Sequence, residues 1–106
     1  MARLARLAVA DHPHLVLLRG HSGHTVFLDD VDRTAFLSAL REACNLERVA
    51  LHAYSLLPDH VWLLGTPASA QALGRTIQAL GRRFSTGFNR RHQRSGSVWD
   101  LSLIHI

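Results

Sequence analysis

Two apolar segments joined by only two residues, Pro58 and Asp59, most constrain the fold of this chain. "VALHAYSLL" (Val49–Leu57) precedes the two residues and "HVWLLGTP" (His60–Pro67) follows them. Each segment has the length and apolar content of a strand, and Pro-Asp is a turn dipeptide. Strands joined by so short a turn must run antiparallel. The sequence therefore predicts a β-hairpin at the centre of the chain.

Another strand and a helix precede this hairpin. "HLVLLRG" (His14–Gly20) is a short apolar run closed by glycine, which predicts a strand buried on both faces. Asp29 or Asp30 can cap a helix that we expect to end near Glu47. The apolar positions of that helix recur every three or four residues: Phe36, Leu40, Ala43 and Cys44.

A second helix and a fourth strand follow the hairpin. Ser69 is the expected cap of a long helix, and "VWD" (98–100) is the expected start of a fourth strand. The apolar stripe of the long helix consists of Leu73, Ile77, Leu80, Phe84 and Phe88. The order β-α-β-β-α-β predicts an α+β, ferredoxin-like sandwich in which two helices cover one face of an antiparallel sheet. A chain of 106 residues has room for one such domain.

Charge indicates the kind of partner. All 12 basic residues are arginines and the net charge is +4, which favours a polyanion, nucleic acid first. No Asp or Glu occurs between His60 and Trp99, so we expect the second helix to carry an unopposed positive field that contacts phosphates. Its arginines are Arg75, Arg82, Arg83, Arg90 and Arg91.

The cysteine count and the lengths of the apolar runs indicate where the protein is located in the cell. The single cysteine, Cys44, excludes an internal disulfide, and no apolar run approaches the roughly 18 residues of a membrane span. We therefore expect a cytoplasmic protein with no membrane partner.

The last six residues, 101–106, read "LSLIHI". One codon choice for them, CTG-TCT-CTT-ATA-CAC-ATC, matches the transposon end used in sequencing-library adapters. We interpret them as adapter that follows a natural frame cut after about Asp100, and exclude them from functional reasoning. The alternative is a genuine C-terminal strand, since short apolar runs are ambiguous.

Residues 1–100 as a whole resemble one family. The similarity runs through "HPHLVLLRG", "VFLDDVDRTAFLSALREA", "LHAYSLLPDHVWLLGTP" and "LGRTIQALGRRFSTGFNRRHQRSGSVWD", in the family's order and spacing. That family is the REP-associated tyrosine transposases, which belong to the His-hydrophobe-His (HUH) endonuclease superfamily. The resemblance implies a truncated HUH-type transposase domain that binds single-stranded or hairpin DNA, as a monomer or a homodimer.

The resemblance also implies a chemistry. In such enzymes two histidines on a central strand bind Mg²⁺ or Mn²⁺, and a tyrosine from a later helix attacks the scissile phosphate. His60 matches the first histidine and Val61 the hydrophobe, but Trp62 stands at the second histidine and its indole nitrogen only donates. The only tyrosine, Tyr54, lies upstream of the motif. The family's catalytic tyrosine therefore has no counterpart here.

Several residues have two interpretations. His60 is either a metal ligand or a histidine hydrogen-bonded to the hairpin turn. A turn centred on Pro58-Asp59 would place His52 and Tyr54 opposite Trp62, where His52 could replace the lost ligand. Trp62 either packs beside Tyr54 or stacks on an unpaired base. Arg19, at the end of the first strand, matches a family position near the DNA-binding surface and is otherwise a surface charge.

Three functions follow from these residues. The first is a fragment of an HUH-type tyrosine transposase bound to single-stranded or hairpin DNA, inactive as it stands. The second is a catalytically dead DNA-binding relative, in which Trp62 replaced the second histidine when cleavage was lost. The third is an RNA-binding module of the RRM type, which requires an aromatic-rich motif on a central strand that "HVWLLG" does not supply.

Overall fold

The computed structural model describes residues 9–105, and the side chains of residues 9–100. Its strands are β1 (His14–Gly20), β2 (Val49–Leu57), β3 (His60–Pro67) and β4 (Trp99–His105). Its helices are α2 (Asp30–Glu47) and α3 (Ala72–Arg91), with a 3₁₀ turn, η1 (His21–Gly23), after β1. The predicted β-α-β-β-α-β order is confirmed.

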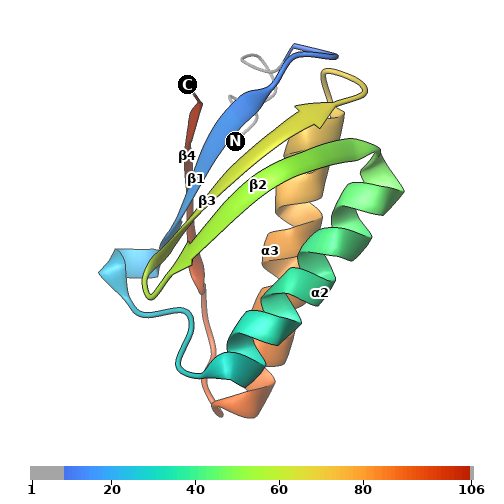
Figure 1. Cartoon of the computed structure of the whole chain (residues 1–106). Helices are drawn as coiled ribbons and strands as arrows, with labels where there is room; N and C mark the ends of the chain where they lie inside the picture. The colour runs from blue at the N-terminus through green and yellow to red at the C-terminus, as the bar shows by residue number, and fades with distance from the viewer. Residues whose placement is uncertain (1–8, 106) are drawn as a thin grey trace.

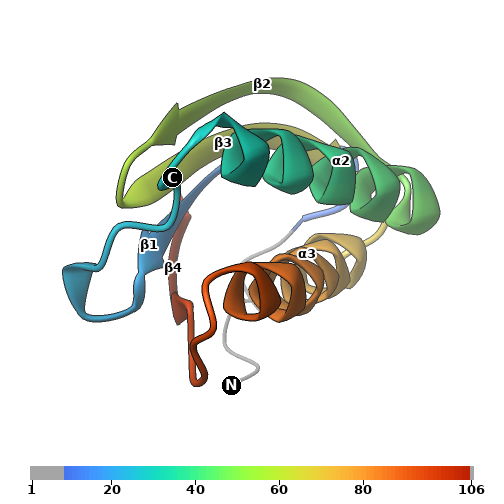
Figure 2. The same ribbon diagram turned by 90° about the horizontal axis from the view of Figure 1, so that it is seen from below.

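The four strands form one antiparallel sheet in the order β2-β3-β1-β4. Both helices lie on the same side of this sheet, which curves around them (Figure 1 and Figure 2). The predicted ferredoxin-like sandwich is therefore confirmed. Neither helix of the described residues 9–105 lies on the other side of the sheet, which is called the open face below.

The core fills the space between the sheet and the two helices. Burial alternates along β3, where Val61 and Leu63 point towards the helices and their neighbours do not. Every member of the predicted stripe on α3 is buried. The centre of the core is aromatic: the rings of Phe27, Phe36, Phe84 and Trp99 lie with centroids 5.3 to 6.4 Å apart.

The predicted start of the first helix is confirmed. Asp29 is the N-cap of α2, and its carboxylate accepts the Asp32 N–H at 3.0 Å. The predicted cap of the second helix is wrong by two residues: the N-cap of α3 is Gln71, whose side chain makes no capping hydrogen bond. Ser69 lies one turn earlier, and its hydroxyl accepts the N–H of Ala72, the first residue of α3, at 3.2 Å.

The prediction that β1 is buried on both faces holds only in part. On the open face Leu17 is buried, but Leu15 is half-buried and Arg19 is exposed. The pairing of β2 with β3 contains a bulge at His52 that the sequence did not predict. Leu51 pairs with Gly65, whereas Ala53 pairs with Leu64.

The backbone of β4 continues from Trp99 to His105, so the strand predicted to start at "VWD" is present. The side chains of residues 101–106 lie outside the described part, and the adapter interpretation of these residues stays a prediction. Within residues 9–105, neither α2 nor α3 has the length and apolar character of a membrane-spanning helix.

Candidate nucleic-acid interface

A row of polar side chains crosses the open face near the hairpin turn. His60 and Trp62 alternate with the buried Val61, so both project onto the open face as predicted. Arg19 of β1 pairs with His60 on one side and with Asp100 of β4 on the other. Strand pairing thus brings together residues that lie up to 81 positions apart in the chain, from Arg19 to Asp100.

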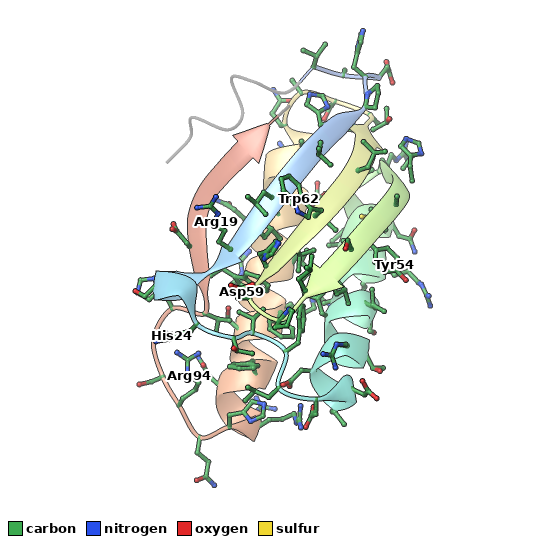
Figure 3. All side chains as sticks on the ribbon, turned by 60° about the vertical axis from the view of Figure 1, so that its left-hand side comes forward. Arg19, His24, Tyr54, Asp59, Trp62 and Arg94 are labelled. Atoms are coloured by element: carbon green, nitrogen blue, oxygen red, sulfur yellow. The ribbon has the colours of Figure 1, made fainter. Side chains whose placement is uncertain are left out.

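These residues line an open pocket of about 450 Å³. Figure 3 shows Arg19, Asp59 and Trp62 at this part of the sheet, whereas Tyr54 lies at its outer edge. The whole lining is Leu17, Arg19, Gly20, Ser22, Gly23, Asp59, His60, Trp62 and Asp100. It combines an arginine, an aromatic surface and a glycine-containing loop with two carboxylates, Asp59 and Asp100. An arginine beside an exposed aromatic ring is an arrangement that can contact a phosphate and a base of nucleic acid.

Backbone hydrogen bonds fix the rim of this pocket. The Gly20 N–H donates to the Asp59 carbonyl at 2.8 Å, and the His21 N–H donates to the Val98 carbonyl at 2.8 Å. The chain turns so tightly after β1 that a Cβ on Gly20 would lie 2.1 Å from the His24 carbonyl oxygen. Only glycine fits there, and the η1 turn is held over the end of the sheet.

His60 is hydrogen-bonded to the hairpin turn, which is one of the two interpretations given for it. Its Nδ1 lies 2.8 Å from Oδ1 of Asp59 and donates to that carboxylate, which can only accept. This hydrogen bond holds the pKa of Asp59 below its ordinary value. The imidazole is 30% exposed, so its ring remains accessible from the pocket.

The residues present do not make a divalent-cation site. Among residues 9–100, no three His, Cys, Asp or Glu side chains converge in a way that could hold a metal ion. Trp62 stands where the sequence resemblance leads us to expect a second ligand, and an indole N–H cannot coordinate a metal. A single imidazole is a poor site for Mg²⁺, which prefers oxygen ligands. No catalytic step through a metal is therefore derived for this chain.

The predicted pairing of His52 and Tyr54 with Trp62 is wrong, because the two-residue turn pairs Leu57 with His60 and so sets a different residue opposite Trp62. The bulge at His52 lies farther along β2 and shifts only the pairs beyond it. Ser55 is the residue opposite Trp62. His52 instead hydrogen-bonds Thr66 Oγ1 at 2.8 Å. Since Thr66 lies six residues beyond His60 on β3, the two histidines are about 20 Å apart along the strand. The structure does not bring them together.

Tyr54 faces the opposite side of the sheet from His60. It pairs with Leu63, a core residue, and lies with Leu37 and Arg41 in a pocket between β2 and α2. Trp62 therefore does not pack beside Tyr54. Its cross-strand neighbours are Ser55 and Leu17, and its ring centroid is 6.5 Å from that of His60.

The α3 arginines lie in the helix layer, away from the open face, and their field is not unopposed as predicted. The acids that oppose them come from α2 and its cap, which pack against α3. Arg75 lies 4.0 Å from Glu47, and Arg83 pairs with Glu42. Arg91 pairs with Asp29 at 3.1 Å and also with Asp32. Within the described side chains, Arg82 and Arg90 have no carboxylate partner.

Arg91 belongs to a polar network that the sequence analysis missed. The Asp32 carboxylate, 2% exposed, accepts from the Leu28 N–H at 2.9 Å, from His92 Nε2 at 3.0 Å and from Arg91. The hydrogen bond from Arg91 holds the pKa of Asp29 below its ordinary value. The network ties the start of α2 to the end of α3. The fold brings "DDVD" at the start of α2 together with "NRRH" at the end of α3, and these two charged segments are the signal that could have revealed the network.

The fold and the pocket together define a class: a small β-α-β-β-α-β sheet protein whose open face carries a pocket of charged and aromatic side chains. Sequence comparison with family models and with curated proteins finds no match. Solved structures do match. A candidate transposase from Deinococcus radiodurans R1 aligns at a TM-score of 0.72 and 19% identity, over 95% of this chain and 82% of that one.

A REP-associated tyrosine transposase bound to a REP hairpin aligns at a TM-score of 0.78 and 10% identity. That alignment covers all of this chain, which spans 61% of the length of the transposase. At these identities the comparisons establish a shared fold. The resemblance drawn from the sequence is thus confirmed for the architecture.

Proposed function

We propose that this chain binds single-stranded or hairpin DNA on its open sheet face, as a relative of the HUH tyrosine transposases that does not cleave DNA. The observation that carries the proposal is the pocket in which Arg19, His60 and Trp62 meet on a fold shared with a hairpin-bound transposase. That transposase was solved with a REP hairpin, which makes a DNA hairpin the natural first ligand to test.

The residues of the pocket have different roles in this proposal. Arg19 is exposed and supplies the positive charge for a backbone phosphate. Trp62 is half-buried beside Leu17, so its ring is held in place while one surface remains available for a base. His60, oriented by Asp59, adds a hydrogen-bonding group between the two.

Strand cleavage is not supported by these residues. The reaction needs a nucleophile close to the scissile phosphate. The only tyrosine, Tyr54, is directed to the helix side of the sheet, and no metal site is formed by the described residues. We expect no tyrosine-linked product when single-stranded DNA is incubated with the protein and Mn²⁺. A covalent, protease-sensitive adduct would contradict the assignment.

Fluorescence anisotropy with labelled oligonucleotides tests the binding. We expect the protein to bind a DNA hairpin or a single strand more tightly than duplex DNA, with an affinity that falls as salt rises. A double variant, Arg19→Gln with Trp62→Ala, should lose most of this binding. The matched control, Arg75→Gln with Arg83→Gln, removes two arginines from the helix layer and should retain it.

Two results would contradict the proposal. One is equal loss of DNA binding in the open-face variant and in the helix-layer control. The other is a clear preference for single-stranded RNA over DNA of the same sequence, which would favour the RRM-type alternative.

We also propose that the natural reading frame continues beyond Asp100 without the codons for 101–106. Genomic sequence across this point separates the two transposase-related alternatives. A downstream helix that contains a tyrosine supports a fragment of an enzyme. A stop codon, or a helix without tyrosine, supports a relative that only binds.

A further inference from the structure

A second pocket lies between α3 and the start of β4, on the helix side of the sheet. Its volume is about 330 Å³. Its lining consists of Gln78, Gly81, Arg82, Ser85, Ser97, Val98 and Trp99. The helix residues among them recur at three- and four-residue spacing, so they form one face of α3 directed towards β4. The pocket shares no residue with the one on the open face.

Trp99 brings an unused hydrogen-bond donor to this pocket. The residue is only 5% exposed, and its Nε1 has no hydrogen-bond partner among the described residues. It is the one buried side-chain nitrogen or oxygen in that part of the chain left without a partner. Buried indole N–H groups usually have an acceptor. Within the described residues this donor is therefore left for an acceptor from outside that part of the chain.

The edge of the indole that carries the buried N–H lies beside Gly81, a residue of the pocket lining. A Cβ placed on Gly81 would lie 3.7 Å from Cδ1 of Trp99, the carbon bonded to Nε1. Gly81 itself lines the pocket, and it leaves the space beside this edge unfilled by a side chain. The opposite part of the ring system packs in the core against Phe27, Phe36 and Phe84.

The rest of the lining has the charge that an anion needs. Arg82 is exposed and, unlike Arg83 and Arg91, has no carboxylate partner within the described side chains. Ser85 and Ser97 add hydroxyl donors, and no Asp or Glu lines the pocket. A guanidinium, an indole N–H and two hydroxyls without a carboxylate form a set of donors suited to the oxygens of one oxyanion.

We propose that the pocket between α3 and β4 binds a phosphate group, held by the Arg82 guanidinium and the Trp99 indole N–H. The phosphate is either free in solution or part of a nucleic-acid strand. This site stands on the unpartnered Trp99 donor and does not depend on DNA binding at the open face. If the phosphate belongs to a nucleic-acid strand, this site gives the protein a phosphate contact on the side of the sheet opposite to Arg19.

Two-dimensional ¹H–¹⁵N NMR of the full chain tests the proposal through the tryptophan indole resonances. There are two tryptophans, and the signal that disappears in Trp62→Phe identifies the other as Trp99. Addition of sodium phosphate should move the Trp99 N–H resonance downfield and saturate, whereas sodium chloride at equal ionic strength should not. Arg82→Gln should weaken the phosphate affinity by about tenfold or more.

The matched control is Arg90→Gln, which removes another α3 arginine without a carboxylate partner in the described part of the chain. It should leave the phosphate titration unchanged. A saturating shift with inorganic phosphate identifies a free-phosphate site, and one seen only with a short 5′-phosphorylated oligonucleotide identifies a nucleic-acid phosphate. No shift with either, or the same shift in Arg82→Gln as in the unaltered protein, would overturn the proposal. Because phosphate is the probe, failure of DNA binding at the open face would not affect this test.

Discussion

The helix layer and the open sheet face arrange their charges differently. In the helix layer, Arg75, Arg83 and Arg91 are matched with carboxylates of α2 and its cap. On the open face, Arg19 shares a pocket with the indole of Trp62 and with two carboxylates, one of which is hydrogen-bonded to His60. The difference teaches that a row of arginines on one helix is not by itself an unopposed positive field. The carboxylates that the fold brings opposite the arginines reduce that field.

The largest effect expected from this comparison is on stability, at Asp32. Asp32→Ala leaves the Leu28 N–H and His92 without their acceptor and Arg91 with only Asp29. We expect a loss of about 2–4 kcal/mol in the free energy of unfolding, measured by chemical denaturation. Asp30→Ala is the control, since Asp30 is 96% exposed and pairs only with Arg33. It should change stability by less than about 1 kcal/mol. Equal effects would refute the structural role of the Asp32 network.

The next effect is on DNA affinity, at Trp62. If a base stacks on the indole, Trp62→Ala should weaken binding by about 1–3 kcal/mol, or about 5- to 150-fold. Trp62→Phe, which keeps an aromatic surface, should lose much less. Anisotropy titrations of both variants give the comparison. Unchanged affinity in Trp62→Ala would assign the residue to packing alone.

A smaller effect on DNA affinity is expected at Arg19, and it is best measured through the salt dependence of binding. If Arg19 contacts one phosphate of a single strand, Arg19→Gln should reduce the slope of log affinity against log salt by about 0.7. Arg83→Gln, in which a paired arginine is removed from the helix layer, should leave that slope unchanged. An unchanged slope in Arg19→Gln together with a reduced slope in Arg83→Gln would indicate that DNA binds the helices instead.

The smallest effect concerns the titration of Asp29. Because Arg91 holds the pKa of Asp29 below its ordinary value, the folded state gains stability from the ionised carboxylate. That gain is present above the unfolded pKa and is lost as pH falls through the lower folded pKa. Carboxyl ¹³C NMR should show Asp29 titrating below its ordinary value of 3.8, and Arg91→Gln should raise its pKa towards that value. An unchanged pKa in the variant would exclude Arg91 as the cause.

The fold was predictable because each element carries its own signal. The turn at Pro58-Asp59 and the alternation in β3 define the hairpin, and the stripe from Leu73 to Phe88 defines α3. The order of these elements then limits the topology to few solutions. The bulge at His52 was not predictable, because the residues around it alternate too weakly to specify a register.

The site was predictable only in part. His60, Trp62 and Arg19 could be identified from their strands, since strand periodicity determines which side chains share a face. The pairing of the α3 arginines with Glu42, Glu47 and Asp32 could not, because it depends on how two helices pack rather than on the sequence of either one. The unpartnered donor of Trp99 also appears only once the core is assembled.

The central claim is that the open sheet face is the main DNA-binding surface, and not the paired arginines of α3. A ¹H–¹⁵N NMR titration with a DNA hairpin or single strand tests it most directly, because one experiment reports on both layers. We predict that the largest shift changes occur at Leu17, Arg19, His60 and Trp62, while Arg75, Arg83 and Arg91 change little. Shift changes concentrated along α3, with the open face unaffected, would contradict the claim.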